Sequence, residues 1–179
     1  FIPLIWQGDT QYESPGYLSR FQQYNGSGLP LAQFGGYISV TGGGGDMYNS
    51  YLTRYNQVHD DISPLSMNLA SDIIGDQIHL EIEVEVLENV SSSNNKVVFI
   101  LTSFQDEDYF SSVISYDYET FNYTSIGDII THNLAIDIQP EWELDLVKFV
   151  GMVQSYSDDH ILQAREMSVP LNNLMAMDA

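Results

Sequence analysis

The side chains with the clearest capacity for chemistry are carboxylates that gather in expected turns, at residues 60–61, 106–108 and 158–159. Ca²⁺ takes about six to eight oxygen ligands, and loops rich in Asp and Glu supply them. Asp106, Glu107 and Asp108 are the best candidates for a Ca²⁺ site because they form the longest acidic run. None of these clusters has the D-x-[DN]-x-[DN]-G spacing of a calcium loop, so a solvated turn is the default interpretation. We expect no other cofactor.

The remaining reactive residue types lack the spacing that catalysis requires. His59, His79, His132 and His160 lie in separate segments without an H-x-H or HExxH pattern, and we expect all four to be exposed strand or loop residues. The serines lack a G-x-S-x-G elbow, and the glycine run at 42–45 lacks the lysine of a phosphate loop. Cysteine is absent, which excludes thiolate chemistry. Nothing selects a carboxylate pair for glycoside hydrolysis. We therefore expect no enzymatic activity.

The charge balance excludes two classes of partner. The chain has 179 residues, with 25 acidic and 5 basic side chains and a formal net charge of −20. Binding to nucleic acid requires a surface of Lys and Arg, which five scattered basic residues cannot form. The same shortage argues against docking on an anionic membrane surface.

The composition favours an exported protein. Charged residues make up only 17% of the chain, while 44% of its residues are hydrophobic, enough for a substantial core. We expect an extracellular or cell-surface location, and a chain that begins at Phe1 suits a processed mature terminus. Asn25, Asn89 and Asn122 each begin an N-x-S/T glycosylation sequon, although three sequons are unsurprising in a chain so rich in Asn and Ser.

The first third of the sequence predicts alternating strands and helices. Residues 1–7 (FIPLIWQ) form an apolar run typical of a buried strand, and a helix should begin at Ser14-Pro15. Short strands are expected at 31–34 and 37–41. Asp46 should cap a second helix, which carries Tyr51 and Tyr55 on its apolar side.

This order of elements resembles the second half of a thioredoxin fold. The segments FIPLIWQGD, SPGYLSRFQQYNGSGLP, FGG and GGGGDMYNSYLTRY, with VVFILTS, LVKFVGMVQ and HILQA later, are also similar to a secreted family of Bacteroidota related to outer membrane protein twenty-eight. The resemblance implies a thioredoxin-like region joined to an immunoglobulin-like sandwich, and a cis peptide bond at Pro30. The family's Gly-Tyr/Val-Pro-Thr step is replaced here by Gly-Leu-Pro-Leu at 28–31.

The likeness covers only the half of the thioredoxin unit that lacks the cysteine pair. In a complete unit, a further strand would lie between the 1–7 strand and the 31–34 strand. Since a buried strand cannot leave its backbone groups unpaired, we expect another segment to fill this position. The candidates are a cleaved N-terminal fragment, the tail of the same chain, or a strand from another copy.

The remaining sequence predicts an antiparallel sandwich. Residues 78–88 (IHLEIEVEVLE) alternate apolar and polar side chains, and further strands are expected at 96–104, 113–118, 126–138, 144–155 and 160–167. Trp142 and Phe149 are expected to be core or corner residues. The predicted fold class is α+β, with a partial thioredoxin-like segment at 1–61 and an immunoglobulin-like β-sandwich at 62–179.

Three functional classes remain open. The leading hypothesis is a non-enzymatic extracellular structural protein that self-associates, as the subunit of a surface filament built by strand addition between copies. The expected contact residues are the apolar ones of both terminal segments: Phe1, Ile2, Leu4, Ile5, Trp6, Leu171, Leu174 and Met175. The alternatives are a monomeric surface module that binds a glycan or a protein, and a redox-dead fragment of a larger secreted precursor.

Overall fold

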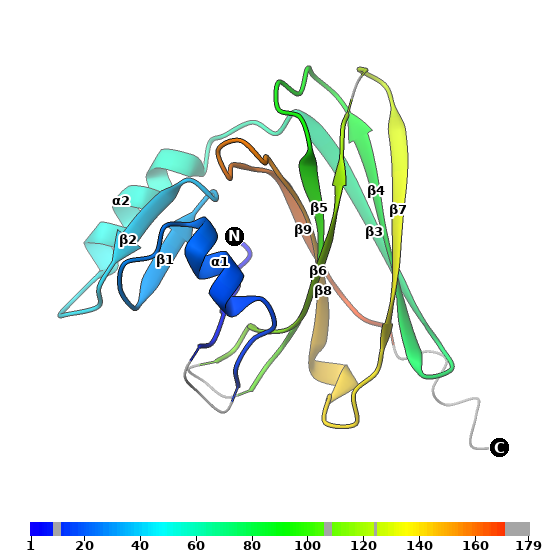
Figure 1. Ribbon diagram of the computed structural model, residues 1–179, viewed down its shortest axis with the longest axis horizontal. Coiled ribbons are helices and arrows are strands. Elements are labelled where there is room, and N and C mark those ends of the chain that lie inside the picture. The colour runs from blue at the N-terminus through cyan, green and yellow to red at the C-terminus, as the bar shows by residue number, and fades with distance from the viewer. Residues whose placement is uncertain (9–11, 106–108, 124, 171–179) are drawn as a thin grey trace.

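The structure is a computed structural model that describes residues 1–8, 12–105, 109–123 and 125–170. A small helical and hairpin unit comes first and contains α1 (Tyr17–Gln23), β1 (Leu31–Phe34), β2 (Ile38–Thr41) and α2 (Tyr48–Val58). Seven longer strands follow and form two facing sheets (Figure 1). The chain is therefore an α+β protein, as the sequence predicts.

The two sheets of the sandwich are both antiparallel. One contains β3 (Leu65–Ile74), β4 (Gln77–Val86) and β7 (Ile129–Asp137), in the order β3-β4-β7. The other contains β5 (Asn95–Ser103), β6 (Ser112–Phe121), β8 (Val147–Gln154) and β9 (Ile161–Ser168), in the order β6-β5-β8-β9. A short 3₁₀ turn, η1 (Leu144–Leu146), precedes β8. Three strands facing four is an arrangement of the immunoglobulin-like class.

The core between the sheets follows from strand alternation. Because successive side chains of a strand point to opposite faces, β4 directs alternate residues inward. Its inward residues are Ile78, Leu80, Ile82, Val84 and Val86, each at most 2% exposed. Phe149 of β8 is fully buried opposite them and Trp142 packs against the same core, so both predicted core positions are confirmed.

The N-terminal segment departs from its predicted role. Residues 1–7 do not form a strand of the first sheet, which consists of β1 and β2 alone among the described residues. Ile5 instead makes one parallel bridge to Ser112 at the edge of β6, through Ile5 N–H to Ser111 O (3.0 Å) and Val113 N–H to Ile5 O (2.9 Å). The expectation that residues 1–7 form a buried strand of the first sheet is therefore wrong.

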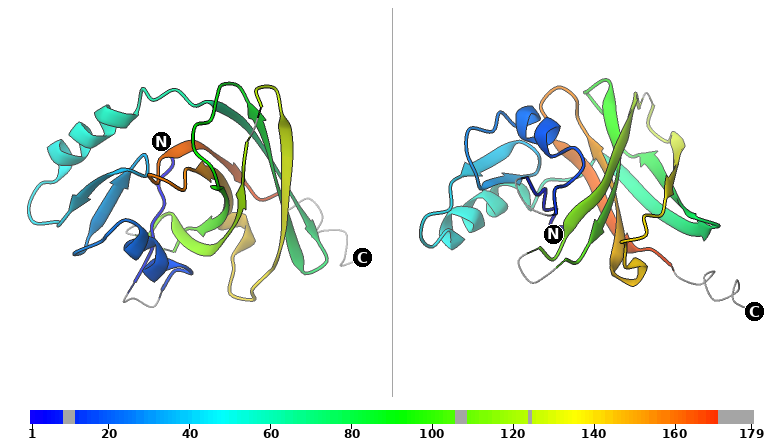
Figure 2. Two further views of the ribbon diagram at one scale, coloured as in Figure 1. Left: turned by 45° about the horizontal axis from the view of Figure 1, so that its top comes forward. Right: turned by 60° about the horizontal axis from the view of Figure 1, so that its bottom comes forward.

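The physical reason lies on the outer face of the four-stranded sheet. Ile2, Leu4 and Trp6 pack against that face, and Figure 2 shows the segment running between the hairpin unit and the sandwich. They cover Val98, Ile100, Val113, Val150 and Met152, each at most 1% exposed. An apolar segment without a neighbouring strand in its own sheet thus buries its side chains on the nearest apolar surface. As a result, β5 is buried on both faces.

Within the hairpin unit, several local predictions are confirmed. Helices occur where expected, and the Tyr48 N–H donates to Asp46 Oδ1 (2.9 Å) at the start of α2. The Leu29–Pro30 peptide bond is cis, as the sequence resemblance implies. Ser14 does not cap α1, which begins after Gly16. Ser14 is buried, and its Oγ accepts the Gln7 N–H (2.9 Å).

The hairpin turn docks on the turn between β8 and β9. Ile161 N–H donates to Gly35 O (2.8 Å), and the neighbouring Gly36 has a φ of +84°. A Cβ atom at Gly36 would lie 1.9 Å from the Asp159 carbonyl oxygen, so only glycine allows this approach. The Tyr37 ring lies 4.7 Å from the His160 ring, and the Tyr37 hydroxyl donates to Asp61 (2.8 Å). These contacts fix the unit against the sandwich.

Candidate self-association surface

The outer edge of β1 is an open strand edge. Gly42 N–H donates to Pro30 O (2.9 Å), which makes 30/42 a hydrogen-bonded pair of the β1–β2 ladder. Because such pairs alternate in an antiparallel ladder, the backbone groups of Ala32 and Phe34 also face β2. Those of Leu31 and Gln33 face away from β2, where no described strand pairs with them. The edge therefore offers two donors and two acceptors to an incoming strand.

A helix with one solvent-facing aromatic side lies beside this hairpin. None of the residues of α2 is fully buried, and Tyr51 contacts Phe34 of β1 with 5.8 Å between ring centroids. The exposed ridge of the helix consists of Tyr48, Leu52 and Tyr55, which follow one another at intervals of four and three residues and adjoin Tyr51 on the helix surface. Phe1 extends this ridge because its ring lies 6.2 Å from that of Tyr55.

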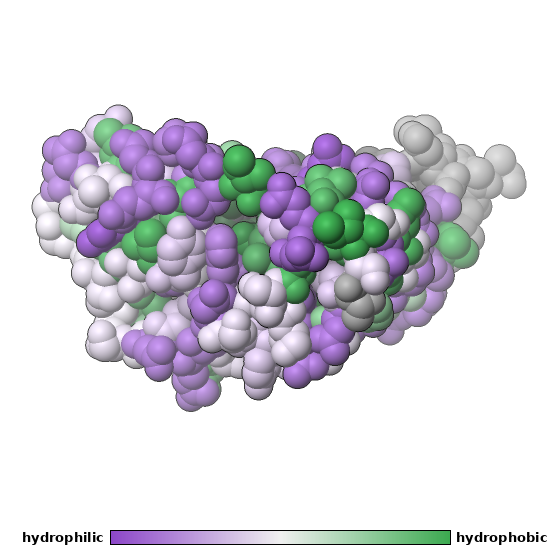
Figure 3. Space-filling view, turned by 90° about the horizontal axis from the view of Figure 1, so that it is seen from above, coloured by the Kyte–Doolittle hydropathy of each residue, from purple (hydrophilic) through white to green (hydrophobic). Residues whose placement is uncertain are grey.

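The face of the molecule seen from above is not broadly hydrophobic. Figure 3 shows hydrophobic residues as separate patches within a largely hydrophilic face. Scattered patches of this kind are normal for a monomer surface. Any association at this end of the molecule would therefore depend on backbone pairing at β1, with the α2 ridge as a flanking contact.

The predicted contact residues of the N-terminal segment differ in their exposure to solvent. Phe1 is 91% exposed, so it is available to a neighbour. Ile2, Leu4 and Trp6 are partly buried on their own sandwich, and Ile5 is paired with β6. Leu171, Leu174 and Met175 lie outside the described residues, as do the Ca²⁺ candidates Asp106, Glu107 and Asp108.

For the remaining predicted sites, the structure shows only where the residues lie. The sequon residues Asn25, Asn89 and Asn122 are all exposed. No group of three or more His, Cys, Asp or Glu residues within the described ranges is arranged to hold a metal ion. Across those same ranges, no helix is both long and apolar enough to cross a membrane.

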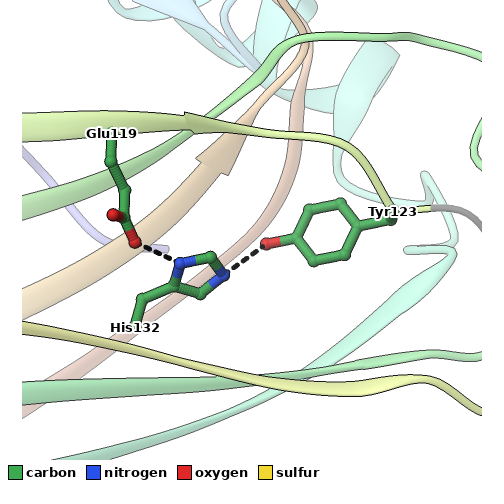
Figure 4. A network of polar contacts seen from close by, with 3 residues as sticks. All are labelled: Glu119, Tyr123 and His132. Atoms are coloured by element: carbon green, nitrogen blue, oxygen red, sulfur yellow. Dashed lines mark hydrogen bonds and ion pairs between the residues drawn. The ribbon is translucent and has the colours of Figure 1, made fainter.

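A partly buried polar network links β6 and β7, one strand from each sheet (Figure 4). His132 of β7 is 4% exposed, which corrects the expectation that all four histidines are exposed. Its Nδ1 contacts Glu119 Oε1 of β6, and its Nε2 lies 3.4 Å from the Tyr123 hydroxyl. With Nδ1–H donating to the carboxylate, Nε2 can accept the hydroxyl proton of Tyr123.

The chemistry of this network suits a structural role. Burial raises the pKa of the Tyr123 hydroxyl, and the Glu119 charge raises it further, so the phenol keeps its proton. β6 and β7 belong to different sheets, and the Glu119–His132 contact links them. Sequence spacing does not reveal the network, because Glu119 and His132 lie in separate strands whose positions depend on the fold.

A second buried cluster joins α1 to the sandwich. Arg20 is only 4% exposed, and its guanidinium lies 5.2 Å from the Trp6 ring, 4.8 Å from the Tyr24 ring and 5.7 Å from the Tyr116 ring. Its Nη1 donates to Gln154 Oε1 (2.7 Å), and Gln154 is fully buried. The cation is thus held by rings and amides. Amphipathic spacing in α1 does not predict a buried arginine.

The fold defines an immunoglobulin-like sandwich with an N-terminal helical and hairpin unit, and a solved structure is similar to it over most of the chain. HBP35 of Porphyromonas gingivalis matches with 12% identity and a TM-score of 0.62, over 86% of this chain. This chain spans 56% of that structure's length. At this identity the likeness concerns the fold alone.

Two other structures match less closely. One is a domain of the outer membrane lipoprotein Omp28 from Porphyromonas gingivalis, with 9% identity and a TM-score of 0.47, over 61% of this chain and 92% of that one. The other is catalytically inactive OgpA from Akkermansia muciniphila, solved with an O-glycopeptide, with 9% identity and a TM-score of 0.43, over 60% of this chain and 28% of that one. No protein-family model and no curated protein matches the sequence.

Proposed function

We propose that this chain is a non-enzymatic extracellular structural protein that self-associates into a surface filament by strand addition. The observation that carries the proposal is the open edge of β1, where the backbone groups of Leu31 and Gln33 face away from β2. A strand from another copy would satisfy these groups and extend the sheet. The extracellular location rests on the low content of charged residues.

The donor strand in this proposal is the apolar segment that contains Leu171, Leu174 and Met175. This segment is poorly placed to pair with the β1 edge of its own copy. Ile161 hydrogen-bonds to the hairpin turn, and β9 then runs away from that turn for 8 residues, or about 26 Å. A returning chain would need about 8 extended residues to come level with the turn again. Donation to a neighbouring copy avoids this reversal and produces a head-to-tail chain.

Proline substitution can test the edge without disturbing the hairpin. Because the Gln33 N–H faces away from β2, Gln33→Pro should leave the β1–β2 ladder intact and block an added strand. Gln33→Ala keeps the N–H and is the matched control. We expect wild type and Gln33→Ala to form elongated assemblies in electron microscopy and Gln33→Pro to remain monomeric, with unchanged far-ultraviolet circular dichroism.

Deletion of residues 171–179 tests the donor. Truncated copies should not assemble alone, and they should stop the growth of full-length chains when mixed with them. A full-length protein that stays monomeric in light scattering across salt and Ca²⁺ concentrations would falsify the proposal.

A further inference from the structure

Two of the chain's five basic residues lie close together on the outer face of the four-stranded sheet. Arg20 lies on the buried side of α1, and Lys96 at the start of β5 is partly buried beside it. No carboxylate of the described residues lies within 4.0 Å of either cation, whereas Lys148 pairs with Glu166 at 3.0 Å. In a protein with a net charge of −20, two neighbouring cations without a carboxylate contact are unusual.

Two tyrosine rings flank the Lys96 ammonium. Its Nζ lies 4.8 Å from the Tyr118 ring centroid and 5.8 Å from that of Tyr156. Tyr118 is 46% exposed and Tyr156 is 61% exposed, so both rings remain accessible to solvent. The only polar contact recorded for Nζ within the described chain is a long one, 3.5 Å to Gln23 Oε1. An ammonium has three donors, and at least two are therefore available to a ligand.

Paired strands hold two of these three groups. Lys96 lies opposite Thr120 of β6 and Gln154 of β8 in the sheet register. Tyr118 lies two residues before Thr120 in β6 and therefore on the same face of the sheet. Tyr156 comes from the turn between β8 and β9, near the upper end of the sandwich in Figure 1. Because its base is built on paired strands, the group is preorganised for binding.

The local electrostatics favour an anion. Burial lowers the pKa of Lys96, and the nearby Arg20 charge lowers it further, while Asp159 partly offsets both effects. The Asp159 carboxylate already accepts a hydrogen bond from the Gln23 amide. An added carboxylate beside Lys96 would reduce the repulsion between the two cations.

We propose that Lys96, Tyr118 and Tyr156 form a binding site for an acidic sugar residue, such as a hexuronate unit of a glycan. The sugar carboxylate would accept hydrogen bonds from the Lys96 ammonium, and the apolar face of the ring would stack on the exposed tyrosines. This site is separate from the β1 edge, so it stands whether or not the protein forms filaments.

The test is titration of the full chain with sodium glucuronate, glucose and inorganic phosphate, followed by ligand-observed nuclear magnetic resonance at low protein concentration. Lys96→Met removes the ammonium, and Lys148→Met is the matched control because it removes an equal charge from the same sheet. We expect saturable glucuronate binding that Lys96→Met weakens by about tenfold or more, since one charge-assisted contact is lost. Lys148→Met should change the affinity by less than about twofold.

Tyr156→Ala provides a second variant at an exposed turn, where folding is not at risk, and it should also weaken binding. The proposal is overturned if glucose binds as tightly as glucuronate, if phosphate binds more tightly, or if Lys148→Met causes the same loss as Lys96→Met. The proposal is also overturned if both single variants, Tyr156→Ala and Lys96→Met, bind glucuronate as tightly as wild type.

Discussion

Gly36 shows how a single residue can hold two parts of the molecule together. Its positive φ and its contact with the Asp159 carbonyl both exclude a side chain. We expect Gly36→Ala to lower the free energy of unfolding by about 2–4 kcal/mol, because backbone strain and overpacking act together.

Gly75 supplies the control for this substitution. It has a φ of +63° in the β3–β4 turn, and a Cβ there would meet nothing within 4 Å. Gly75→Ala should therefore cost only the strain, about 1–2 kcal/mol. Urea denaturation followed by circular dichroism measures both variants. Equal losses would mean that the contact with Asp159 contributes nothing.

The Arg20–Gln154 contact predicts an asymmetry between its two partners. Gln154→Leu leaves a buried cation without its best acceptor and should cost about 1–3 kcal/mol. Arg20→Met removes the charge itself while keeping an apolar side chain among the rings, and it should cost less. The double variant Arg20→Met/Gln154→Leu should be more stable than Gln154→Leu alone. Chemical denaturation of the three proteins tests this order, which fails if Arg20→Met is the most damaging change.

Tyr123 predicts a loss of stability at alkaline pH. Burial and the Glu119 charge raise its pKa in the folded state above the unfolded value of about 10. The native protein therefore retains a proton that the unfolded chain releases. The resulting stability is complete below about pH 10 and falls as the pH rises further. Urea midpoints between pH 8 and pH 11 should fall less steeply in Tyr123→Phe than in wild type.

The exposed Tyr48 provides the comparison for this slope. Tyr48→Phe removes a hydroxyl that lies at the surface of α2, so a difference between the two variants reports on the buried position of Tyr123. If Tyr123→Phe and wild type decline in parallel, ionisation of Tyr123 does not contribute to the pH dependence.

At the scale of elements, strand alternation accounts for most of what the sequence predicts. The inward and outward residues of β4 differ sharply in polarity, and its predicted range agrees with the observed one to within two residues. β3 also alternates, but Ser71 and Ala70 interrupt the contrast, so the sequence pattern does not predict this strand. Its position is instead determined by pairing with β4 along ten residues.

Long-range partners decide the elements that the sequence did not predict. Residues 1–7 have the composition of a buried strand, yet their environment depends on which surface is nearest in the fold. The clusters around Arg20 and His132 likewise combine residues that lie more than ten positions apart in the chain. Local patterns contain no information on such pairings, so these two clusters could not be predicted from spacing alone.

At the scale of the whole molecule, the net charge of −20 opposes the assembly that we propose. Identical copies repel, and the range of that repulsion shrinks from about 30 Å at 0.01 M ionic strength to about 8 Å at 0.15 M. We therefore expect assembly to strengthen as NaCl is added, with a larger effect of CaCl₂ at equal ionic strength. Light scattering as a function of salt measures this response. Assembly that weakens with salt would indicate contacts between opposite charges rather than strand pairing.

The burial of Ile2, Leu4 and Trp6 on the sandwich has a consequence for how the protein unfolds. The boundary near residues 61 and 62 separates two regions with different sequence patterns. The first residues of the chain nevertheless cover five apolar side chains of the four-stranded sheet. Cutting the chain at that boundary would leave this sheet with an uncovered apolar face. The two regions therefore share one surface, and loss of the N-terminal segment should lower the melting temperature of the sandwich itself.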